Sequence, residues 1–241
     1  MIGLKKGRYT ARQASSAADV RAAQALRAKC FGLDDDIDPF DAACTHILIL
    51  RAADDAVVCC FRMMPLTGAD ISRSYSAQYY ELSALAAYGG KMVEMGRFCV
   101  DPEVTDPDIL RVAWGAMTAY VDDHDVELLF GCSSFAGTET AEYLDAFAML
   151  KARHLAPKRW LPRVKAPKVF KYAARLRRKP DAKKAMLRMP PLLRTYLMMG
   201  GWVSDHAVVD DQMNTLHVFT GVEIGAIPPA RKRLLRAVVG G

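Results

Sequence analysis

The alternation of apolar and polar stretches along the chain predicts a protein built from both strands and helices. Continuous apolar runs between turn residues indicate buried strands, and apolar residues spaced three or four positions apart indicate helices. Strands are predicted over residues 7–13, 45–51, 56–64, 91–102, 126–135, 202–210 and 214–223. Helices are predicted over residues 17–30, 108–121, 139–154 and 192–201. This order favours a mixed α/β fold, with a mostly antiparallel sheet and helices on both of its faces.

Residues typical of caps and turns support several of these boundaries. Ser16 and Thr138 can cap the helices that follow them, because a hydroxyl oxygen accepts from a free amide of the first helical turn. Two strands separated by Ala-Ala-Asp-Asp within residues 45–64 predict an antiparallel hairpin. Residues 75–90 are expected to contain a short helix that ends at a pair of glycines.

The strand over residues 91–102, KMVEMGRFCVDP, carries one acid and one base inside an apolar run. Alternation places Glu94 and Arg97 on opposite faces of a regular strand. Gly96 lies between them, and a bulge at this glycine would turn a side chain toward a cleft. The alternative is an acid and an arginine whose partners are on neighbouring strands.

Composition indicates an ordinary globular protein. The chain has 241 residues, of which 51% are hydrophobic and 25% charged, which suits one large domain. No apolar run approaches the ~20 residues of a membrane-spanning helix, and the first residues lack an apolar signal segment. We therefore expect a cytoplasmic protein.

Cysteine and histidine spacing predicts neither a disulfide framework nor a metal site. The six cysteines lie in apolar sequence and none forms a C-x-x-C pair, so they are expected to be reduced thiols in the core. The five histidines lack the spacing of a ligand motif. We expect no metal and no bound cofactor.

Positive charge is concentrated in one segment, residues 151–188. It holds fifteen Lys and Arg and one acidic residue, a local charge of +14 in a chain whose net charge is +6. Such a segment suits nucleic acid, an anionic membrane surface or an acidic protein, and its simplest alternative is a solvated face. Aromatic residues between the cations distinguish it from a simple polybasic tail.

A second charged segment, residues 33–44, contains five aspartates around Pro39. Aspartate is common in turns because its side chain accepts from nearby amides. The same carboxylates, close to two aromatic residues, would also suit a cation.

Three segments together resemble the acyl-homoserine lactone synthases, which have a GNAT-like acyltransferase fold. Residues 61–67 (FRMMPLT) and 93–101 (VEMGRFCVD) are similar to two signatures of these enzymes. Residues 36–41 (DIDPFD) resemble their acidic motif, behind a helix that ends in Arg27 and Phe31. One departure is that no tryptophan lies between Phe31 and this motif.

A closer resemblance is to the ornithine acyl-ACP N-acyltransferase family, GNAT-like enzymes that begin aminolipid synthesis and are often labelled hemolysin-like. It runs from about residue 21 to residue 218. Its most specific segments are DIDPFD (36–41), VEMGRFCVDP (93–102), LLFGCSSFAGT (128–138), HLAP (154–157) and PPLLRTYLMMGGWVSDHAVVDDQMNT (190–215). Glutamine-lipid synthases look very similar, so the resemblance indicates acyl transfer more firmly than it indicates the amine.

The resemblance implies a GNAT-like sheet splayed open at the strand 94–100, with the acyl donor in the opening. It implies a single domain over residues 1–241, with the basic segment 151–188 and a C-terminal extension of a helix and strands over 190–241. GNAT enzymes that use coenzyme A bind its pyrophosphate on a glycine-rich turn at a helix N-terminus. The corresponding turn, DPEVTDPDILR (101–111), lacks these glycines. Phosphopantetheine on an acyl carrier protein is therefore the expected co-substrate.

The implied reaction is attack of the ornithine α-amine on the thioester of a 3-hydroxyacyl chain, which yields lyso-ornithine lipid and the free carrier thiol. Glutamine or another amino acid is an alternative acceptor, and an acyl-homoserine lactone synthase is an alternative enzyme. A cysteine nucleophile, Cys99 or Cys132, is a weaker mechanism because neither has an adjacent activating residue.

Two groups of residues receive catalytic roles from this resemblance. Glu94 is the candidate general base, acting directly or through water, and Arg97 is its catalytic partner on the same strand. Backbone amides near Gly96 and Phe98 would polarise the thioester carbonyl.

Substrate binding is assigned to charged residues of the other motifs. Arg62, Arg97 and Arg27 are candidates for the substrate carboxylate or the pantetheine phosphate, and Phe31 lies beside Arg27 at the helix end. Asp38 and Asp41 would face the cationic side chain of ornithine. Their alternative role is to organise the loop through caps and salt bridges.

The expected partners follow from the charge distribution. Lys158, Arg159, Arg163 and Lys165 are the predicted docking residues for an acidic acyl carrier protein. Peripheral contact with an anionic inner membrane would involve apolar residues 192–202 or the basic tail 230–236. No nucleic acid partner is expected, although a non-enzymatic membrane- or nucleic-acid-binding module is the rival from another class.

Overall fold

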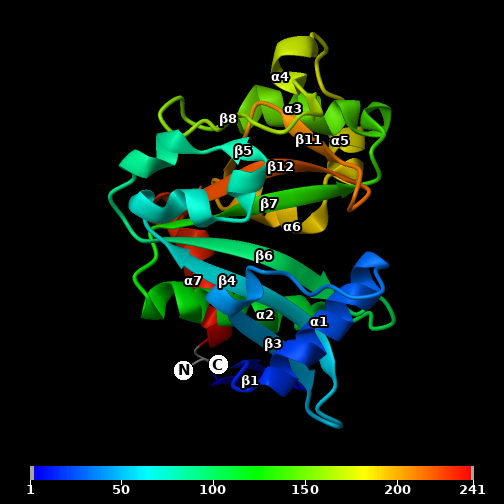
Figure 1. Ribbon diagram of the computed structural model, residues 1–241, viewed down its shortest axis with the longest axis vertical. Helices are drawn as coiled ribbons and strands as arrows, with labels where there is room; N and C mark the ends of the chain where they lie inside the picture. Colours follow the sequence, from blue (N-terminus) through cyan, green and yellow to red (C-terminus); the bar gives the residue numbers. More distant parts are fainter. Residues whose placement is uncertain (1–2, 240–241) are drawn as a thin grey trace. The chain divides into compact units, whose positions relative to one another are not determined.

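The computed structural model describes residues 3–239, which divide into two compact units (Figure 1). Unit 1 contains the described residues up to Pro65, Met95–Val126 and the chain from Pro228 onward, and unit 2 contains Leu66–Glu94 and Glu127–Ile227. Strand β6 (Met92–Val100) begins in unit 2 and ends in unit 1. A single domain over residues 1–241 stays a prediction, and its ends, 1–2 and 240–241, lie outside the described residues.

Unit 1 is a sheet with helices on both faces. Its elements, besides the second half of β6, are β1 (Gly3–Lys6), β2 (Tyr9–Gln13), α1 (Ala17–Phe31), η1 (Asp41–Ala43), β3 (Thr45–Arg51), β4 (Val57–Leu66), α2 (Pro107–Asp123) and α7 (Pro229–Val239). The strand order is β1-β2-β3-β4-β6, and β1 to β4 pair antiparallel with their neighbours. This confirms the hairpin predicted over residues 45–64.

Helix α1 begins and ends where local sequence signals place it. The Ser16 hydroxyl accepts from the amide of Asp19, and the Asp19 carboxylate accepts from the amide of Ser16, which completes a capping box. The helix ends at Gly32, whose φ of 68° is left-handed and favours glycine. The predicted helix and its Ser16 cap are therefore confirmed.

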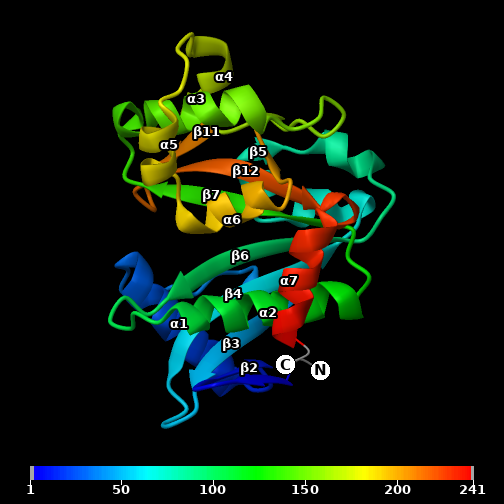
Figure 2. The same ribbon diagram turned by 180° about the vertical axis from the view of Figure 1, so that it is seen from behind.

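The two faces of the unit 1 sheet are covered by different helices. Helix α1 lies on one face, and α2 and α7 lie on the other (Figures 1 and 2). Under α1, Ala23 and Leu26 pack in one buried cluster with Leu48, Cys60 and Cys99. All six cysteines of the chain are free thiols in the structure.

Unit 2 is a second sheet with several short helices. Besides the first half of β6, its elements are η2 (Gly68–Arg73), η3 (Ser76–Gln78), β5 (Tyr80–Glu81), η4 (Ser83–Ala87), β7 (Leu128–Ala136), η5 (Thr140–Tyr143), α3 (Leu144–Arg153), β8 (Arg163–Val164), β9 (Val169–Phe170), α4 (Tyr172–Arg175), α5 (Ala182–Arg188), α6 (Pro191–Met198), β10 (Trp202–Val203), β11 (Ala207–Asp210), β12 (Thr215–Glu223) and η6 (Ile224–Ala226). The strand order is β6-β7-β12-β11-β9, with β10 also on β12 and a separate β5-β8 pair. β6 runs parallel to β7, whereas β7 and β12 form a long antiparallel ladder.

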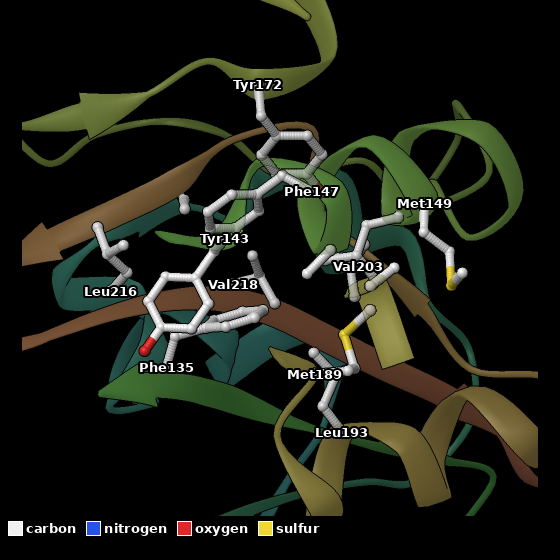
Figure 3. Close-up of a cluster of buried hydrophobic side chains, with 14 of the residues drawn as sticks. Phe135, Tyr143, Phe147, Met149, Tyr172, Met189, Leu193, Val203, Leu216 and Val218 are labelled. Carbon is white, nitrogen blue, oxygen red and sulfur yellow. The ribbon is translucent and has the colours of Figure 1, made fainter. Parts of the chain in front are cut away.

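An aromatic core holds unit 2 together (Figure 3). Phe147 of α3 is fully buried at its centre, with ring centroids 5.0 Å from Phe135, 5.0 Å from Tyr172 and 5.5 Å from Phe170. Strand β12 contributes Leu216 and Val218, so the helices α3 to α6 share one core with the sheet. Burial of this apolar area is the main favourable term for the unit.

Three predicted boundaries in unit 2 are wrong. The helix predicted from residue 139 begins at Leu144, because the buried Tyr143 donates to the Ala136 carbonyl and holds the preceding residues in the tighter η5 turn. The strand predicted over 202–210 is interrupted at Ser204. The Ser204 hydroxyl accepts a hydrogen bond from the Phe219 amide and donates its hydrogen to the His206 carbonyl. The short helix expected within residues 75–90 is η4, which ends at Ala87 and not at the two glycines, and η3 and β5 precede it.

The basic segment 151–188 is built into unit 2. It forms the end of α3, β8, β9, α4 and α5, and most of its cations are exposed. Two of its three aromatic residues, Phe170 and Tyr172, are buried in the core cluster and are therefore not available to stack on the bases of a nucleic acid. The third, Trp160, is half-buried and packs against Tyr88, with ring centroids 5.1 Å apart.

The predicted basic tail over 230–236 is part of helix α7. Its Arg236 donates to both carboxylate oxygens of Asp122 on α2, at 3.0 and 2.9 Å. Among the described residues, no helix combines the length and apolar character that crossing a membrane would require.

A buried histidine joins the unit 2 sheet to the segment that precedes β6. The Tyr80 hydroxyl donates to the carbonyl oxygen of His217 and lies 3.1 Å from its Nδ1. Burial lowers the pKa of His217 to about 4, against an opposing influence of Asp210. The imidazole is therefore neutral at pH 7, and its protonation opposes folding.

Replacement of His217 by Gln should flatten the acid dependence of stability. Because the pKa is lowered in the folded state, stability is complete above the ordinary value of 6.5 and is lost as pH falls toward about 4. The free energy of unfolding of the wild type should drop by about 2–3 kcal/mol more than that of the variant between pH 7 and pH 4. Urea unfolding at several pH values measures the difference, and parallel curves would contradict the assignment.

Candidate active site

Three arginines and three aspartates form a buried ionic network in unit 1. They come from four parts of the chain that the fold brings together: α1, the loop that follows it, β4 and β6. The members are Arg27, Asp36, Asp38, Asp41, Arg62 and Arg97, and we call them the ionic ring.

The ring is closed, because each arginine binds two aspartates and each aspartate binds two arginines. Arg27 contacts Asp36 at 2.5 Å and Asp41 at 2.8 Å. Arg62 contacts Asp41 at 2.6 Å and Asp38 at 3.0 Å. Arg97 contacts Asp38 at 3.1 Å and Asp36 at 3.0 Å. Opposite charges thus alternate around the ring, and its formal charge is zero.

Burial makes this pairing strong. The side chain of Arg27 is 1% exposed, whereas that of Arg97 is the most exposed in the ring at 14%. Burial raises the pKa of Asp41, but hydrogen bonds from Arg27, Gln24 and Arg62 outweigh it and hold the pKa well below its usual range. Asp41 is therefore ionised at neutral pH.

Aromatic rings lie against two of the guanidinium groups. Arg97 is 5.8 Å from the centroid of the Phe31 ring, and Arg62 is 5.8 Å from that of Phe40. Phe98 instead stacks on Phe61 of β4, at 5.6 Å. Of the two aromatic residues predicted at the site, Phe31 thus contacts the ionic ring through Arg97, and Phe98 packs on β4.

Strand β6 is irregular close to the glycine that the sequence singled out. The left-handed residue is Arg97, with φ of 53°, and not Gly96. A Cβ at Gly96 would meet only the Arg62 Nε, at an ordinary 3.7 Å. A non-glycine residue in this conformation is uncommon, and the two ring aspartates that bind Arg97 help to hold it there.

Glu94, the other charged residue of β6, belongs to a cluster in unit 2. It is 4% exposed and accepts three hydrogen bonds from residues 75 and 76. The Tyr75 amide donates to Oε2 at 2.6 Å, and the Ser76 amide donates to Oε1 at 2.7 Å. The Ser76 hydroxyl also donates to Oε1, at 2.5 Å, and lies 3.4 Å from the Cys132 Sγ. Both carboxylate oxygens are therefore held by donors.

Asp38 and Asp41 are paired with arginines, which is the loop-organising arrangement considered as their alternative role. Asp38 also accepts from the Phe40 amide at 2.7 Å. Their proposed contact with ornithine would replace part of this pairing. The arginines Arg27 and Arg62 are likewise engaged by carboxylates of the chain itself.

The four predicted docking residues are exposed and lie in or near β8. Arg163 and Arg159 approach Glu81 and Glu223 at 3.8 and 4.0 Å, which for exposed pairs contributes little. Lys165 differs from the others, because its ammonium donates to the carbonyl oxygen of Ala77 at 2.6 Å.

Two functional candidates were missed by the sequence analysis. Asp36 stands first in the DIDPFD motif and closes the ionic ring between Arg27 and Arg97. Its position in a recognised motif was a usable signal. Ser76 carried no signal, because a single serine outside any recognised motif does not indicate a hydrogen bond to Glu94.

Histidine, cysteine and carboxylate side chains do not gather as a metal site in the part of the chain that the structure describes.

Substitution of Asp36 by Asn should destabilise unit 1. The change keeps the size of the side chain but leaves Arg27 and Arg97 with one carboxylate fewer in a buried setting. We expect a loss of about 3–5 kcal/mol in the free energy of unfolding. Denaturant unfolding measures it, with Asp35→Asn as the exposed neighbouring control, for which we expect about 0.5 kcal/mol or less. Equal stability of the two variants would contradict the ring.

Comparison with known proteins finds one matching family model and several similar solved structures. The model of the acetyltransferase (GNAT) domain matches residues 22–115. Among solved structures, FeeM, an N-acyl amino acid synthase from uncultured soil microbes, aligns with a TM-score of 0.49 at 10% identity over 97% of each chain. The coenzyme A-dependent acyl-homoserine lactone synthase BjaI aligns with a TM-score of 0.49 at 12% identity, over 92% of this chain and 82% of that one.

Curated relatives extend over most of the chain. The L-ornithine N(alpha)-acyltransferase of Rhodobacter capsulatus is 31% identical over 252 aligned positions, which cover 97% of this chain and 96% of the relative. The enzyme of the same name from Rhizobium meliloti is 30% identical, over 90% of this chain and 80% of the relative. The chain has the GNAT-like acyltransferase fold that its motifs predicted, and it belongs to the L-ornithine N(alpha)-acyltransferase family.

Proposed function

We propose that this N-acyltransferase transfers a 3-hydroxyacyl chain from an acyl carrier protein to the α-amine of ornithine, giving lyso-ornithine lipid. The observation that carries the choice of ornithine is the 31% identity to an L-ornithine N(alpha)-acyltransferase over 97% of the chain. The charges of the ionic ring support ornithine as the acceptor, and the buried position of Glu94 on β6 supports its role as the base.

The ionic ring suits an amino acid with a second ammonium group. A carboxylate of the substrate can replace an aspartate on Arg97, the most exposed member, while the side-chain ammonium replaces an arginine on Asp38 or Asp41. When the Arg97–Asp38 pair is the one replaced, each member of the ring keeps two partners of opposite charge. Glutamine, whose side chain is neutral, would leave a buried charge with one partner fewer, which is costly.

Glu94 is the proposed general base. The α-amine nitrogen attacks the thioester carbonyl carbon, the C–S bond breaks, and the nitrogen loses a proton to the Glu94 carboxylate. The leaving thiolate takes up this proton from the Glu94 carboxyl, which gives the free carrier thiol and restores the ionised base. Backbone amides at Gly96 and Phe98 are the proposed donors to the oxyanion.

The start of helix α2 supports a donor without a pyrophosphate. Asp106 caps this helix, and its carboxylate also accepts from Arg8 and Tyr9, at 2.6 and 2.9 Å. A carboxylate already satisfies the helix N-terminus, where coenzyme A-dependent GNAT enzymes place an anionic pyrophosphate. This favours phosphopantetheine on a carrier protein, and the exposed cations near β8 suit the acidic surface of such a partner.

The amine is tested by measuring thiol release from 3-hydroxyacyl-carrier protein with ornithine, glutamine, lysine, glycine or S-adenosylmethionine. We expect release with ornithine, at least tenfold faster than with glutamine because only ornithine carries the second ammonium. Mass spectrometry of each product confirms the acylated amine. Release with glutamine at an equal rate would remove the proposed role of Asp38 and Asp41, and release with none would refute the function.

Carrier docking is tested by charge reversal of Lys158, Arg159 and Arg163. The triple Glu variant should raise the KM for acyl-carrier protein about tenfold and leave the KM for ornithine unchanged, with the difference shrinking at high salt. Lys165 is kept, because its reversal would also break its bond to Ala77. A matched control reverses Lys179, Lys183 and Lys184, exposed cations elsewhere in the basic segment. An equal effect of both triples would contradict a defined docking site.

A further inference from the structure

Of the three donors to Glu94 named above, one can change its direction. Two are backbone amides, of Tyr75 and Ser76, and the third is the Ser76 hydroxyl. An amide N–H is fixed by the backbone, whereas a hydroxyl hydrogen rotates about its C–O bond.

The backbone around these donors is held on both sides. Ser74 donates to the Ile71 carbonyl and accepts from the Ala77 amide, at 2.8 and 3.2 Å. Lys165 donates to the Ala77 carbonyl at 2.6 Å, and Ala166 donates to the Tyr79 carbonyl at 2.9 Å. The two amides are therefore fixed relative to the Glu94 carboxylate. The Ser76 hydroxyl hydrogen is the donor that can reorient when Glu94 gains a proton.

The Ser76 hydroxyl has a second acceptor within reach. Its oxygen lies 2.5 Å from the Glu94 Oε1 and 3.4 Å from the Cys132 Sγ. Ser76 is fully buried, so water does not offer it another partner. The sulfur of cysteine is a weak acceptor, which makes Glu94 the preferred partner while the carboxylate is ionised.

We propose that Ser76 is a positioning residue for Glu94, with a hydroxyl that points to the carboxylate before proton transfer and to Cys132 after it. This inference rests on the proposed function of Glu94 as the base. When Glu94 Oε1 gains the proton from the amine nitrogen, the new O–H donates to the Ser76 oxygen, and the Ser76 hydroxyl turns to the Cys132 Sγ. The N–H bond breaks, the carboxyl O–H bond forms, and no further proton is required.

Each part of this arrangement has a different consequence. The Ser76 donor stabilises the ionised carboxylate, which keeps Glu94 ready to accept a proton at neutral pH. The turn toward Cys132 replaces a bond that the protonated carboxyl no longer accepts, so that the hydroxyl is not left buried without a partner. Loss of Ser76 should affect both steps, and loss of Cys132 only the second.

The experiment measures two quantities for each variant: the pH profile of kcat, and the titration midpoint of the Glu94 carboxyl carbon by ¹³C NMR. The Glu94 signal is assigned by its absence from Glu94→Gln. Ser76→Ala should raise the midpoint, move the acid limb of kcat to higher pH and lower kcat about tenfold, with the KM for ornithine within about twofold. Ser133→Ala is the matched control, because it removes a buried hydroxyl of β7 that contacts Thr220 and not Glu94.

Cys132 variants separate two effects of Ser76: the hydrogen bond that it donates to ionised Glu94, and the later rotation of its hydroxyl toward Cys132. Cys132→Ala should lower both kcat and the midpoint, because the sulfur accepts from Ser76 only while Glu94 is protonated, and Cys132→Ser, which retains an acceptor, should restore both. An unchanged midpoint in Ser76→Ala overturns the proposal, and wild-type kcat in Cys132→Ala overturns its second step. If the wild type transfers no acyl group but the midpoint moves in Ser76→Ala, the proposed function fails while the hold of Ser76 on Glu94 stands.

Discussion

The closed ring of three arginines and three aspartates is the constraint on which unit 1 depends. It joins α1, the loop after α1, β4 and β6 through buried ion pairs, of which Arg27–Asp36 and Arg97–Asp38 are two. A buried ion pair is costly to break because the remaining charge loses its partner in a medium that solvates it poorly. The same property would make the ring selective as the proposed binding site, since a ligand that brings charges of both signs can replace its members without leaving a buried charge unpaired.

Strand β6 connects this ring to a second buried charge. Arg97, which closes the ring in unit 1, is three residues beyond Glu94, which unit 2 holds with the amides of Tyr75 and Ser76. The two charges have opposite requirements. Arg97 is neutralised by carboxylates of the chain, whereas Glu94 accepts from two backbone amides and from the Ser76 hydroxyl. These donors hold the carboxylate in one position, which suits its proposed role as a base.

Sequence reasoning succeeded where the determining contact is local and was incomplete where it is not. The Ser16 cap and the hairpin of β3 and β4 depend on residues a few positions apart, so their patterns were readable in advance. The interruption of the strand at Ser204 depends on the amide of Phe219, which lies on another strand, so no local sequence pattern predicts it. In the site, the family motifs identified Glu94 and the arginines, but the pairing of each charge, and the role of Ser76, follow from contacts between segments far apart in the chain.

Ornithine labelled with ¹⁵N at the α-amine tests whether the acyl chain is transferred to the α-nitrogen. After incubation with 3-hydroxyacyl-carrier protein and the purified chain, the α-nitrogen should appear as an amide in the ¹⁵N spectrum while the side-chain nitrogen remains an ammonium. A spectrum in which the α-nitrogen stays an amine, with the acyl group on the side-chain nitrogen or on no nitrogen, would contradict the account.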